Sequence, residues 1–461
     1  MSTVAFHTLG CKVNSYDTEA IWHLFREKGY TQVDFDDIAD VYVINTCTVT
    51  HTGDKKSRQM IRRAIRKNTE ATVVVTGCYA QVAPDEILEI PGVDLVIGTQ
   101  GREQIIDYVE RAQAEKNPFK VVASVRKQRH FEELDVPSFH DRTRASLKIQ
   151  EGCNNFCTFC IIPYSRGFIR SRQPENVIKQ AKKLVEAGYY EIVLTGIHTG
   201  GYGDDLDDYN LADLLVDLER EVPEVRRIRI SSIEASELDD KMIDVLTRSK
   251  KVVRHLHIPL QSGSNRVLDR MNRKYTVEEF AERLQAVRRA LPDLAVTSDV
   301  IVGFPGESVE DFEDTYHFIK DQHFADLHVF PYSQRNFTPA AKYKDQVPER
   351  EKEARVNRLI QLANSLQVQY SAKFIGQLLE VIPEERDETG QLVGYTDNYI
   401  KVQFDGGDEL FGELCTIRLE AAGPELSQGS FVERLTFTEK EEPTSELPLA
   451  PFADAIELEM I

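Results

Sequence analysis

The stretch SLKIQEGCNNFCTFC, residues 146–160, joins a strand-like apolar run directly to three closely spaced cysteines. Helix-like segments such as 175–187, 211–221 and 277–290 separate it from further runs of the same kind, which are EIVLTGIH, RIRISSIE, HLHIPLQS, AVTSDVIVGF and DLHVFPYS. Six consecutive strand–helix units predict a partial or complete (β/α) barrel. Such barrels carry their reacting groups at the carboxyl ends of the strands, where these cysteines fall.

Cys153, Cys157 and Cys160 predict an iron–sulfur site with one open iron. Three thiolates can ligate three irons of a 4Fe–4S cluster, and the spacing lacks the fourth cysteine of a ferredoxin run. The open iron can chelate the amino and carboxylate groups of S-adenosylmethionine (SAM), which places the sulfonium near the cluster for one-electron cleavage. A structural zinc site is the plainer alternative, but zinc normally takes four ligands and no nearby His or Cys completes the set.

A second group of cysteines lies in the first 112 residues, whose alternating strand and helix patterns predict a doubly wound parallel α/β domain. Cys11 ends the run FHTLGC, Cys47 ends VYVINTC and Cys78 ends VVVTGC. Because parallel strands end at one edge of a sheet, we expect these cysteines to converge and to hold a second cluster. An inert buried side chain is the ordinary explanation for any one of them alone.

The remaining segments complete the predicted organisation. Residues 113–143 lack periodicity and predict a linker, and residues 144–370 carry the barrel. Short alternating strands predict a small all-β barrel at 371–440, with Cys415 in its core. Residues 441–461 are acidic and contain proline, so we expect a frayed tail.

The composition restricts the compartment and the partners. Seven cysteines in 461 residues are too few for a disulfide scaffold, which favours a reducing, cytoplasmic location. No stretch approaches the roughly 18 apolar residues of a membrane helix, so no membrane partner is expected. A formal net charge of −20 argues against indiscriminate polyanion binding, so a nucleic acid must meet a local basic patch.

CNNFCTFCIIPYSRG, together with the strand-end cysteines, resembles the radical SAM methylthiotransferases across the whole chain. The resemblance implies an N-terminal domain with an auxiliary cluster, a radical SAM barrel and a C-terminal TRAM-type RNA-binding domain. The segments TLGCKVN and NTCTVT resemble the branch that methylthiolates N6-threonylcarbamoyladenosine beside the tRNA anticodon. The isopentenyladenosine branch has glutamine and methionine after its first cysteine, and the ribosomal-protein branch has proline and lysine, where this chain has Lys12 and Val13.

The resemblance also implies the reaction and its requirements. The barrel cluster reduces SAM, and the resulting 5′-deoxyadenosyl radical removes hydrogen from C2 of the adenine. Sulfur carried at the auxiliary cluster and methylated by a second SAM is then transferred to that carbon. Two 4Fe–4S clusters, SAM, the tRNA anticodon stem-loop, an electron donor and a sulfur source are therefore implied. Two alternatives remain. The same chemistry could act on isopentenyladenosine in tRNA or on a ribosomal protein, or the chain could be a non-enzymatic iron–sulfur protein that binds RNA or transfers electrons.

Small and polar residues at predicted strand ends are candidates for binding SAM, although a turn or a helix cap explains each one alone. They are Thr195, Gly196, Ile197, Ser232, Glu234, Gln261, Asp299 and Gly303. His198, His255 and His257 also lie near strand ends, but we leave them unassigned because such histidines are more often structural.

A predicted helix after Cys47 is the main candidate for RNA contact. Residues 55–67 contain no acidic side chain, and Arg58, Arg62 and Arg66 have the spacing that lines one helix face. A solvated run of charge is the ordinary explanation for such a helix. Three arginines after the cluster loop are expected to extend this surface, namely Arg166, Arg170 and Arg172.

The C-terminal unit is acidic for an RNA-binding domain. Its basic candidates for a confined RNA-binding face are Lys401, Arg418 and Arg434. Tyr395 and Tyr399 are the candidates for stacking on bases.

Overall fold

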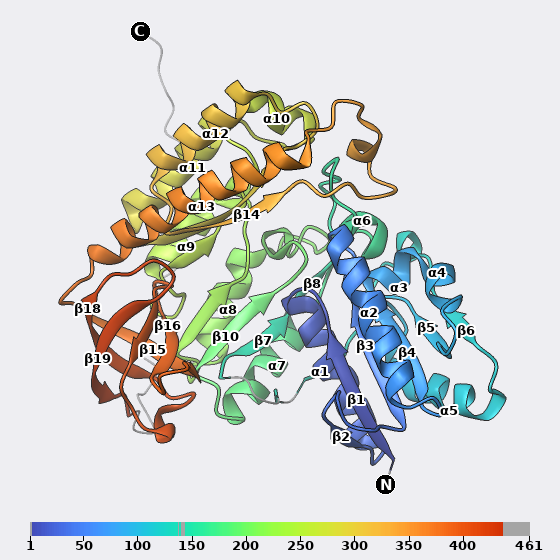
Figure 1. Ribbon diagram of the computed structural model, residues 1–461. Coiled ribbons are helices and arrows are strands. Elements are labelled where there is room, and N and C mark those ends of the chain that lie inside the picture. Colours follow the sequence, from blue (N-terminus) through green and yellow to red (C-terminus); the bar gives the residue numbers. More distant parts are fainter. Residues whose placement is uncertain (1, 137, 140–142, 437–461) are drawn as a thin grey trace.

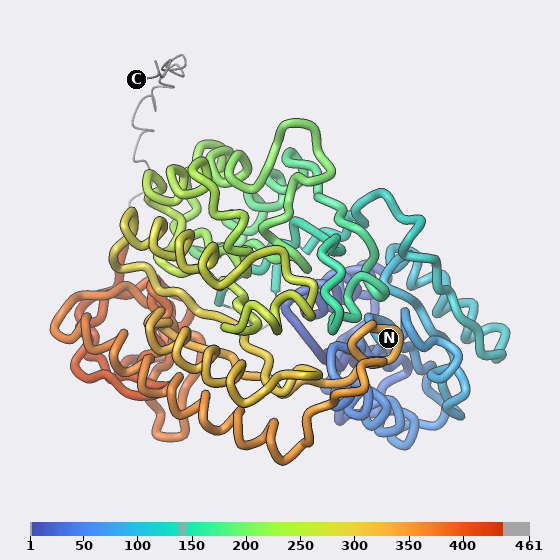
Figure 2. Tube along the Cα trace, turned by 90° about the horizontal axis from the view of Figure 1, so that it is seen from above, coloured from blue at the N-terminus to red at the C-terminus, as the bar shows by residue number. Residues whose placement is uncertain are grey.

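The computed structural model describes residues 2–136, 138–139 and 143–436, and the tail predicted at 441–461 lies outside them. Figure 1 shows an N-terminal α/β domain, a central barrel and a small C-terminal barrel. The first and last of these lie on opposite sides of the molecule, both there and in the view from above in Figure 2. Among the described residues, no helix is long and apolar enough to cross a membrane.

Six parallel strands form the N-terminal sheet, in the order β2-β1-β3-β4-β5-β6. The strands are β1 (Thr3–Thr8), β2 (Thr31–Val33), β3 (Val41–Thr46), β4 (Thr72–Gly77), β5 (Leu95–Ile97) and β6 (Phe119–Val121). The helices are α1 (Lys12–Glu27), α2 (His51–Lys67), α3 (Cys78–Val82), α4 (Pro84–Leu88) and α5 (Ile105–Glu115). This arrangement confirms the predicted parallel α/β domain.

Helices cover both faces of this sheet, which explains the near-continuous apolar runs of its central strands β3 and β4. Val41 and Val43 of β3 pack in one cluster with residues of α1 and α5. Tyr42 and Ile44 point the other way and pack with residues of α2.

The segment predicted as a linker, 113–143, is structured over part of its length. Residues 119–121 form β6, which pairs with β5 and extends the sheet. A strand of three residues is too short to give a readable alternation in the sequence. Further along, the carbonyl of Leu134 accepts a hydrogen bond of 2.8 Å from Tyr16 of α1, and Leu134 joins the core of the central barrel. The segment therefore fastens the first domain to the second.

The central part contains the six predicted parallel strands, as two three-stranded sheets β11-β10-β7 and β12-β13-β14 that meet at a bridge between Ile228 and Val252. The strands are β7 (Ala145–Lys148), β10 (Glu191–Thr195), β11 (Arg227–Ile230), β12 (His255–His257), β13 (Ala295–Val302) and β14 (Asp326–Pro331). A short hairpin pairs β8 (Gln150–Glu151) with β9 (Arg170–Ser171). The partial (β/α) barrel is confirmed.

Helices surround the central strands. They are α6 (Ile162–Ser165), α7 (Pro174–Glu186), α8 (Leu211–Glu221), α9 (Asp240–Arg248), α10 (Asn265–Arg270), α11 (Val277–Ala290), α12 (Val309–Gln322) and α13 (Glu349–Ala372). Capping boxes begin three of them, at Asn210, Thr276 and Ser308. Along β10, Ile192 and Leu194 pack in the apolar core with the helices, so the alternate residues face the barrel interior.

The C-terminal strands close into a barrel in the order β15-β16-β17-β19-β18, as predicted. They are β15 (Leu378–Arg386), β16 (Leu392–Thr396), β17 (Lys401–Phe404), β18 (Cys415–Ala421) and β19 (Ser427–Arg434). Cys415 is fully buried in its core. The barrel packs against the amino ends of the central strands, where the Tyr399 ring stacks on His255 at 3.9 Å. The carboxyl ends of those strands lie away from this contact.

Candidate iron–sulfur and substrate site

Cys11, Cys47 and Cys78 converge at the carboxyl edge of the N-terminal sheet, as predicted. Cys11 precedes α1, Cys47 follows β3 directly, and Cys78 is the first residue of α3 after β4. Burial and the neighbouring charges of Cys78 and Cys11 raise the pKa of Cys47 to about 11. Metal binding here would therefore release protons from Cys11 and Cys47, whose pKa values are raised.

Two glycines allow the backbone to bring these cysteines together. Gly10 has φ of +115°, and a Cβ on it would lie 3.1 Å from the Cβ of Cys47. Gly77 has φ of +97°, and a Cβ there would lie 2.3 Å from Oδ1 of Asn45. Any larger residue would both strain the backbone and force the edge apart.

One arginine of the central domain reaches into this edge. Arg166 has no exposed side-chain surface, and its Nε donates a hydrogen bond of 3.1 Å to Sγ of Cys78. The same guanidinium contacts Asp17 of α1 at 2.9 Å and Glu151 of β8 at 3.0 Å. Asp17 also pairs with Lys148 at 2.8 Å. The contact between the two domains is thus a buried ionic network, centred beside a cysteine sulfur.

Cys153, Cys157 and Cys160 lie on the loop after β8, at the carboxyl ends of the barrel strands. Burial and the charges of Cys157 and Cys153 raise the pKa of Cys160 to about 12. Nη1 of Arg273 donates a hydrogen bond of 3.3 Å to Sγ of Cys157. Neither this trio nor the first brings three sulfurs within 4.8 Å of one another in the described structure.

Residues 166–167 join the two cysteine sites. The side chain of Arg166 donates to Cys78, whereas the carbonyl of Gly167 accepts a backbone hydrogen bond of 3.0 Å from Cys153. Gly167 has φ of +79°, which favours glycine at this turn. The two three-cysteine sites are therefore neighbours across the domain boundary.

Seven of the eight predicted SAM-binding residues lie at or just beyond the carboxyl ends of barrel strands. Thr195 ends β10, and its Oγ1 lies 3.4 Å from Oγ of Ser231. Glu234, after β11, pairs with Arg273 and is thereby tied to the cluster loop. The others in these positions are Gly196, Ile197, Ser232, Gln261 and Gly303.

Asp299, the eighth, lies within β13 rather than after it, between two histidines. Its Oδ2 is 3.3 Å from Nε2 of His257, and its Oδ1 is 3.3 Å from Nδ1 of His328. Of the other unassigned histidines, His198 pairs with Glu237 at 2.6 Å and His255 is buried under Tyr399.

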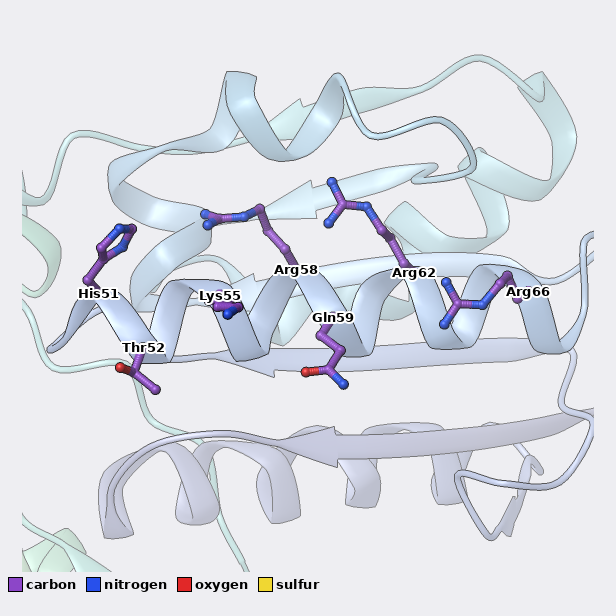
Figure 3. Close-up of a pocket in the computed structure, with 7 residues that line it drawn as sticks. All are labelled: His51, Thr52, Lys55, Arg58, Gln59, Arg62 and Arg66. Carbon is purple, nitrogen blue, oxygen red and sulfur yellow. The ribbon is translucent and has the colours of Figure 1, made fainter.

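The basic face of α2 is present. Figure 3 shows Arg58 and Arg62 reaching toward the same side of the helix. The residues of this face line an open groove of about 590 Å³. Arg62 and Arg66 are exposed, whereas Arg58 contacts the hydroxyl of Tyr79 at 2.7 Å. The first residue of α2, His51, donates its backbone N–H to Ser333, after β14, at 3.1 Å. The groove therefore begins beside the rim of the central barrel.

Two expectations about RNA-contacting surfaces are wrong. Arg166, Arg170 and Arg172 are each at most 1% exposed. Carboxylates pair with Arg166 and Arg172, and backbone carbonyls accept hydrogen bonds from Arg170. Tyr395 and Tyr399 stack on each other at 4.7 Å, and Tyr399 is covered by His255, so neither ring stands free.

The basic candidates of the C-terminal barrel differ in their surroundings. Lys401 is half-buried and pairs with Glu385 at 3.0 Å. Arg418 is exposed and donates to the carbonyl of Gly376 at 2.8 Å. Arg434 is exposed and pairs with Glu413 at 3.0 Å.

Sequence reasoning missed the roles of Arg166 and Arg273 beside the sulfurs. Each arginine lies far along the chain from the cysteine that it contacts, and no sequence motif marks such a pair. A mixed run such as SRGFIRSR carries no sign that its arginines are buried.

Comparison with known proteins gives two matching families. Residues 147–319 match the Radical SAM superfamily, and residues 3–98 match the uncharacterized protein family UPF0004. The chain is 61% identical to the threonylcarbamoyladenosine tRNA methylthiotransferase MtaB of Bacillus subtilis, over 94% of this chain and 97% of that protein. It is 41% identical to the protein of the same name from Aquifex aeolicus, over 90% and 99%.

More distant relatives carry another name. The tRNA-2-methylthio-N(6)-dimethylallyladenosine synthase of Clostridium novyi is 36% identical, over 90% of this chain and 93% of that protein. Among solved structures, the radical S-adenosylmethionine methyltransferase TsrM of Kitasatospora setae superposes with a TM-score of 0.56 at 15% identity, over 74% of this chain and 77% of that one. This last likeness concerns the fold alone.

Proposed function

The chain belongs to the threonylcarbamoyladenosine tRNA methylthiotransferases of the radical SAM superfamily, and from that premise we propose which side chains serve the reaction. The reaction places a methylthio group on the adenine of N6-threonylcarbamoyladenosine. The observation that supports the proposal is the junction at residues 166–167, where one short segment contacts both three-cysteine sites. Chemistry shared between two clusters requires such proximity.

Cys153, Cys157 and Cys160 hold the barrel cluster in this proposal. Bound there, a 4Fe–4S cluster and SAM supply one-electron cleavage and an organic radical, which acid–base groups of the chain could not provide. Arg273 places a positive charge against Cys157 and is held in position by Glu234. Its charge favours the thiolate form of that cysteine, which is the form that binds iron.

SAM binds along the strand ends above the barrel. Thr195, Gly196 and Ile197 leave β10 together, and Gly196 packs so closely on Gln150 that a Cβ would lie 2.9 Å from its Oε1. This close approach leaves backbone groups accessible to a ligand. The other contacts come from Ser232, Glu234, Gln261 and Gly303, and Asp299 faces the same interior from β13.

Cys11, Cys47 and Cys78 hold the auxiliary cluster. Arg166 donates to Cys78 and is fixed by Asp17 and Glu151, so its position is set by both domains. An external sulfur source and an electron donor complete the requirements, and a reducing cytoplasm suits both.

The tRNA anticodon stem-loop lies along α2 in this proposal. Arg58, Arg62 and Arg66 line its groove, and Lys401 and Arg418 offer further contacts on the C-terminal barrel. Because the overall charge is −20, this local basic face supplies the attraction for phosphate.

Anaerobic reconstitution tests the proposal directly. The protein is incubated with SAM, a reductant, sulfide and an anticodon stem-loop that carries threonylcarbamoyladenosine, and the nucleosides are analysed by mass spectrometry. We expect the 2-methylthio product from the native chain and none from Cys153→Ala or Cys47→Ala. Each variant should keep about four irons, those of the remaining cluster. Loss of all iron in both variants, or one tightly held zinc, would refute the two-cluster assignment.

Methylthiolation of dimethylallyladenosine is the second candidate, because relatives 36% identical over most of the chain bear that name. A parallel incubation with a dimethylallyladenosine stem-loop separates the two. A product from this RNA alone would show that the substrate assignment is wrong.

A further inference from the structure

Three polar side chains form a chain of contacts on the interior wall of the central barrel. They come from neighbouring strands: His257 from β12, Asp299 from β13 and His328 from β14. One ligand-forming atom of each lies within 4.8 Å of the others. The SAM and cluster contacts proposed above account for neither histidine.

The inner members of this wall are fixed by their neighbours. Nδ1 of His257 bonds Oγ1 of Thr297 at 2.9 Å, which aims its Nε2 at Asp299. The two oxygens of Asp299 then face one histidine each, at 3.3 Å. Below them His255 also bonds Thr297, at 3.0 Å, and is capped by Tyr399. The floor of the interior is therefore closed.

His328 is the member that remains available. Its side chain is 46% exposed, against 13% for His257, and its Nε2 has no hydrogen-bond partner in the part of the chain that the structure describes. The contact with Asp299 raises the pKa of His328, which favours the imidazolium form with a proton on each nitrogen. Nε2 is then a charged donor on the side of the ring that faces away from Asp299.

Positive charge of the N-terminal domain acts on this wall. Lys12 of that domain is among the charges that lower the pKa of His328 and of His255. Lys12 follows Cys11 directly and begins α1, whose positive end adds to the field. An anionic group that accepts a hydrogen bond from Nε2 of His328 would be favoured by the charge of the imidazolium.

The substrate of the proposed function carries such a group. A threonylcarbamoyl substituent ends in a carboxylate and a hydroxyl, whereas a dimethylallyl substituent has only carbon and hydrogen. An apolar group packed over Nε2 of His328 would remove this donor from water without giving it an acceptor, which is costly. We propose that His328, oriented by Asp299 and His257, binds the carboxylate of the threonylcarbamoyl group and selects it over the dimethylallyl group. This inference rests on the proposed function and names its specificity determinant.

Binding measurements on the reconstituted full chain test this selectivity. The probes are anticodon stem-loops carrying threonylcarbamoyladenosine, the neutral carboxamide of the same nucleoside, or dimethylallyladenosine. The native protein should bind the carboxylate at least about tenfold more tightly than the carboxamide, as expected for one charge-assisted hydrogen bond. His328→Leu should remove this preference. It should also reduce the difference in affinity between the threonylcarbamoyladenosine and dimethylallyladenosine stem-loops.

The controls keep the result interpretable. His317→Leu removes an exposed histidine of α12 and should retain the full preference. His328→Gln keeps a polar side chain of similar size without the charge, so it should fold and still lose the preference, and iron content verifies that each variant is assembled. If His328→Gln discriminates as the native chain does, the inference is overturned.

Two further outcomes are distinguishable. A zinc or iron ion bound in addition to the clusters and lost with His328→Gln would identify a metal site and overturn the carboxylate assignment. Methylthiolation of dimethylallyladenosine alone by the native chain would refute the proposed function itself. Methylthiolation of threonylcarbamoyladenosine without any carboxylate preference would refute only this inference.

Discussion

The auxiliary site and the barrel site each place one arginine against one cysteine sulfur, but the two arginines are held differently. Arg273 belongs to the same domain as Cys157 and pairs with Glu234, also of that domain. Arg166 crosses from the central domain to Cys78 and is fixed by Asp17 on one side and Glu151 on the other. The barrel site is thus self-contained, whereas the auxiliary site is completed only when both domains are packed together.

Arg166→Leu should have the largest effect, because Arg166 is the side chain through which the central domain contacts the auxiliary site. It leaves Asp17 and Glu151 buried with fewer cationic partners, a change that typically costs about 3–5 kcal/mol. We expect a lower thermal midpoint and partial loss of auxiliary iron, with barrel iron retained. Calorimetry and iron counts measure both. Equal loss from the two sites would contradict the asymmetry.

Arg273→Gln should act on the barrel site alone. Removing a residue that supports a metal ligand typically costs 10-fold to 100-fold in affinity or activity. We expect SAM cleavage, followed as 5′-deoxyadenosine release, to fall by roughly tenfold. Auxiliary iron should be unchanged, and a loss of auxiliary iron would show that the barrel site is not self-contained.

Acid should loosen the domain boundary. Burial raises the pKa of Glu151, but Arg166 and Lys148 outweigh it and hold the pKa at about 2. Because this folded value lies below the ordinary value of 4.5, the carboxylate stabilises the fold above pH 4.5 and loses that contribution as pH falls toward 2. Glu151→Gln should flatten the decline in thermal midpoint over that range. If the thermal midpoint of the Glu151→Gln protein declines with falling pH as steeply as in the native chain, Glu151 is not the source of that decline.

Arg62→Gln should have the smallest effect, since it lies outside both cysteine sites. Removing one phosphate contact should weaken binding of every stem-loop alike and reduce the salt dependence of log Kd by about 1. Binding titrations across salt concentrations measure this slope. Arg63→Gln is the matched control, because Arg63 pairs with Asp36 rather than lining the groove. Equal salt dependence of log Kd in the Arg62→Gln and Arg63→Gln proteins would argue against the groove as the phosphate-binding surface.

The sequence predicts the features that repeat along it. Six strand-like runs give the central barrel, and the ends of three others place Cys11, Cys47 and Cys78 at one edge. The bounds of α8 and α11 match the predicted ranges because apolar periodicity and caps agree there. The family resemblance adds the reaction, which no spacing could supply.

Features that depend on residues far apart in the chain could not be predicted from the sequence. Arg166 looks like a surface charge until Asp17, 149 residues away, is placed beside it. Tyr399 looks like a stacking platform until His255 covers it. In both cases the partner comes from another domain, and local pattern carries no information about domain packing. The wall of His257, Asp299 and His328 was not predicted as a group because three separate strands of the central barrel supply it.

A redox titration of the auxiliary cluster tests the central claim most directly. In a chain with Cys153, Cys157 and Cys160 all changed to alanine, only that cluster remains, and electron paramagnetic resonance follows its reduction. Adding Arg166→Gln removes a positive donor from Cys78, which disfavours the more negative reduced state. We predict a more negative midpoint potential in the Arg166→Gln protein. An unchanged or more positive potential would contradict the claim that the central domain completes the auxiliary site.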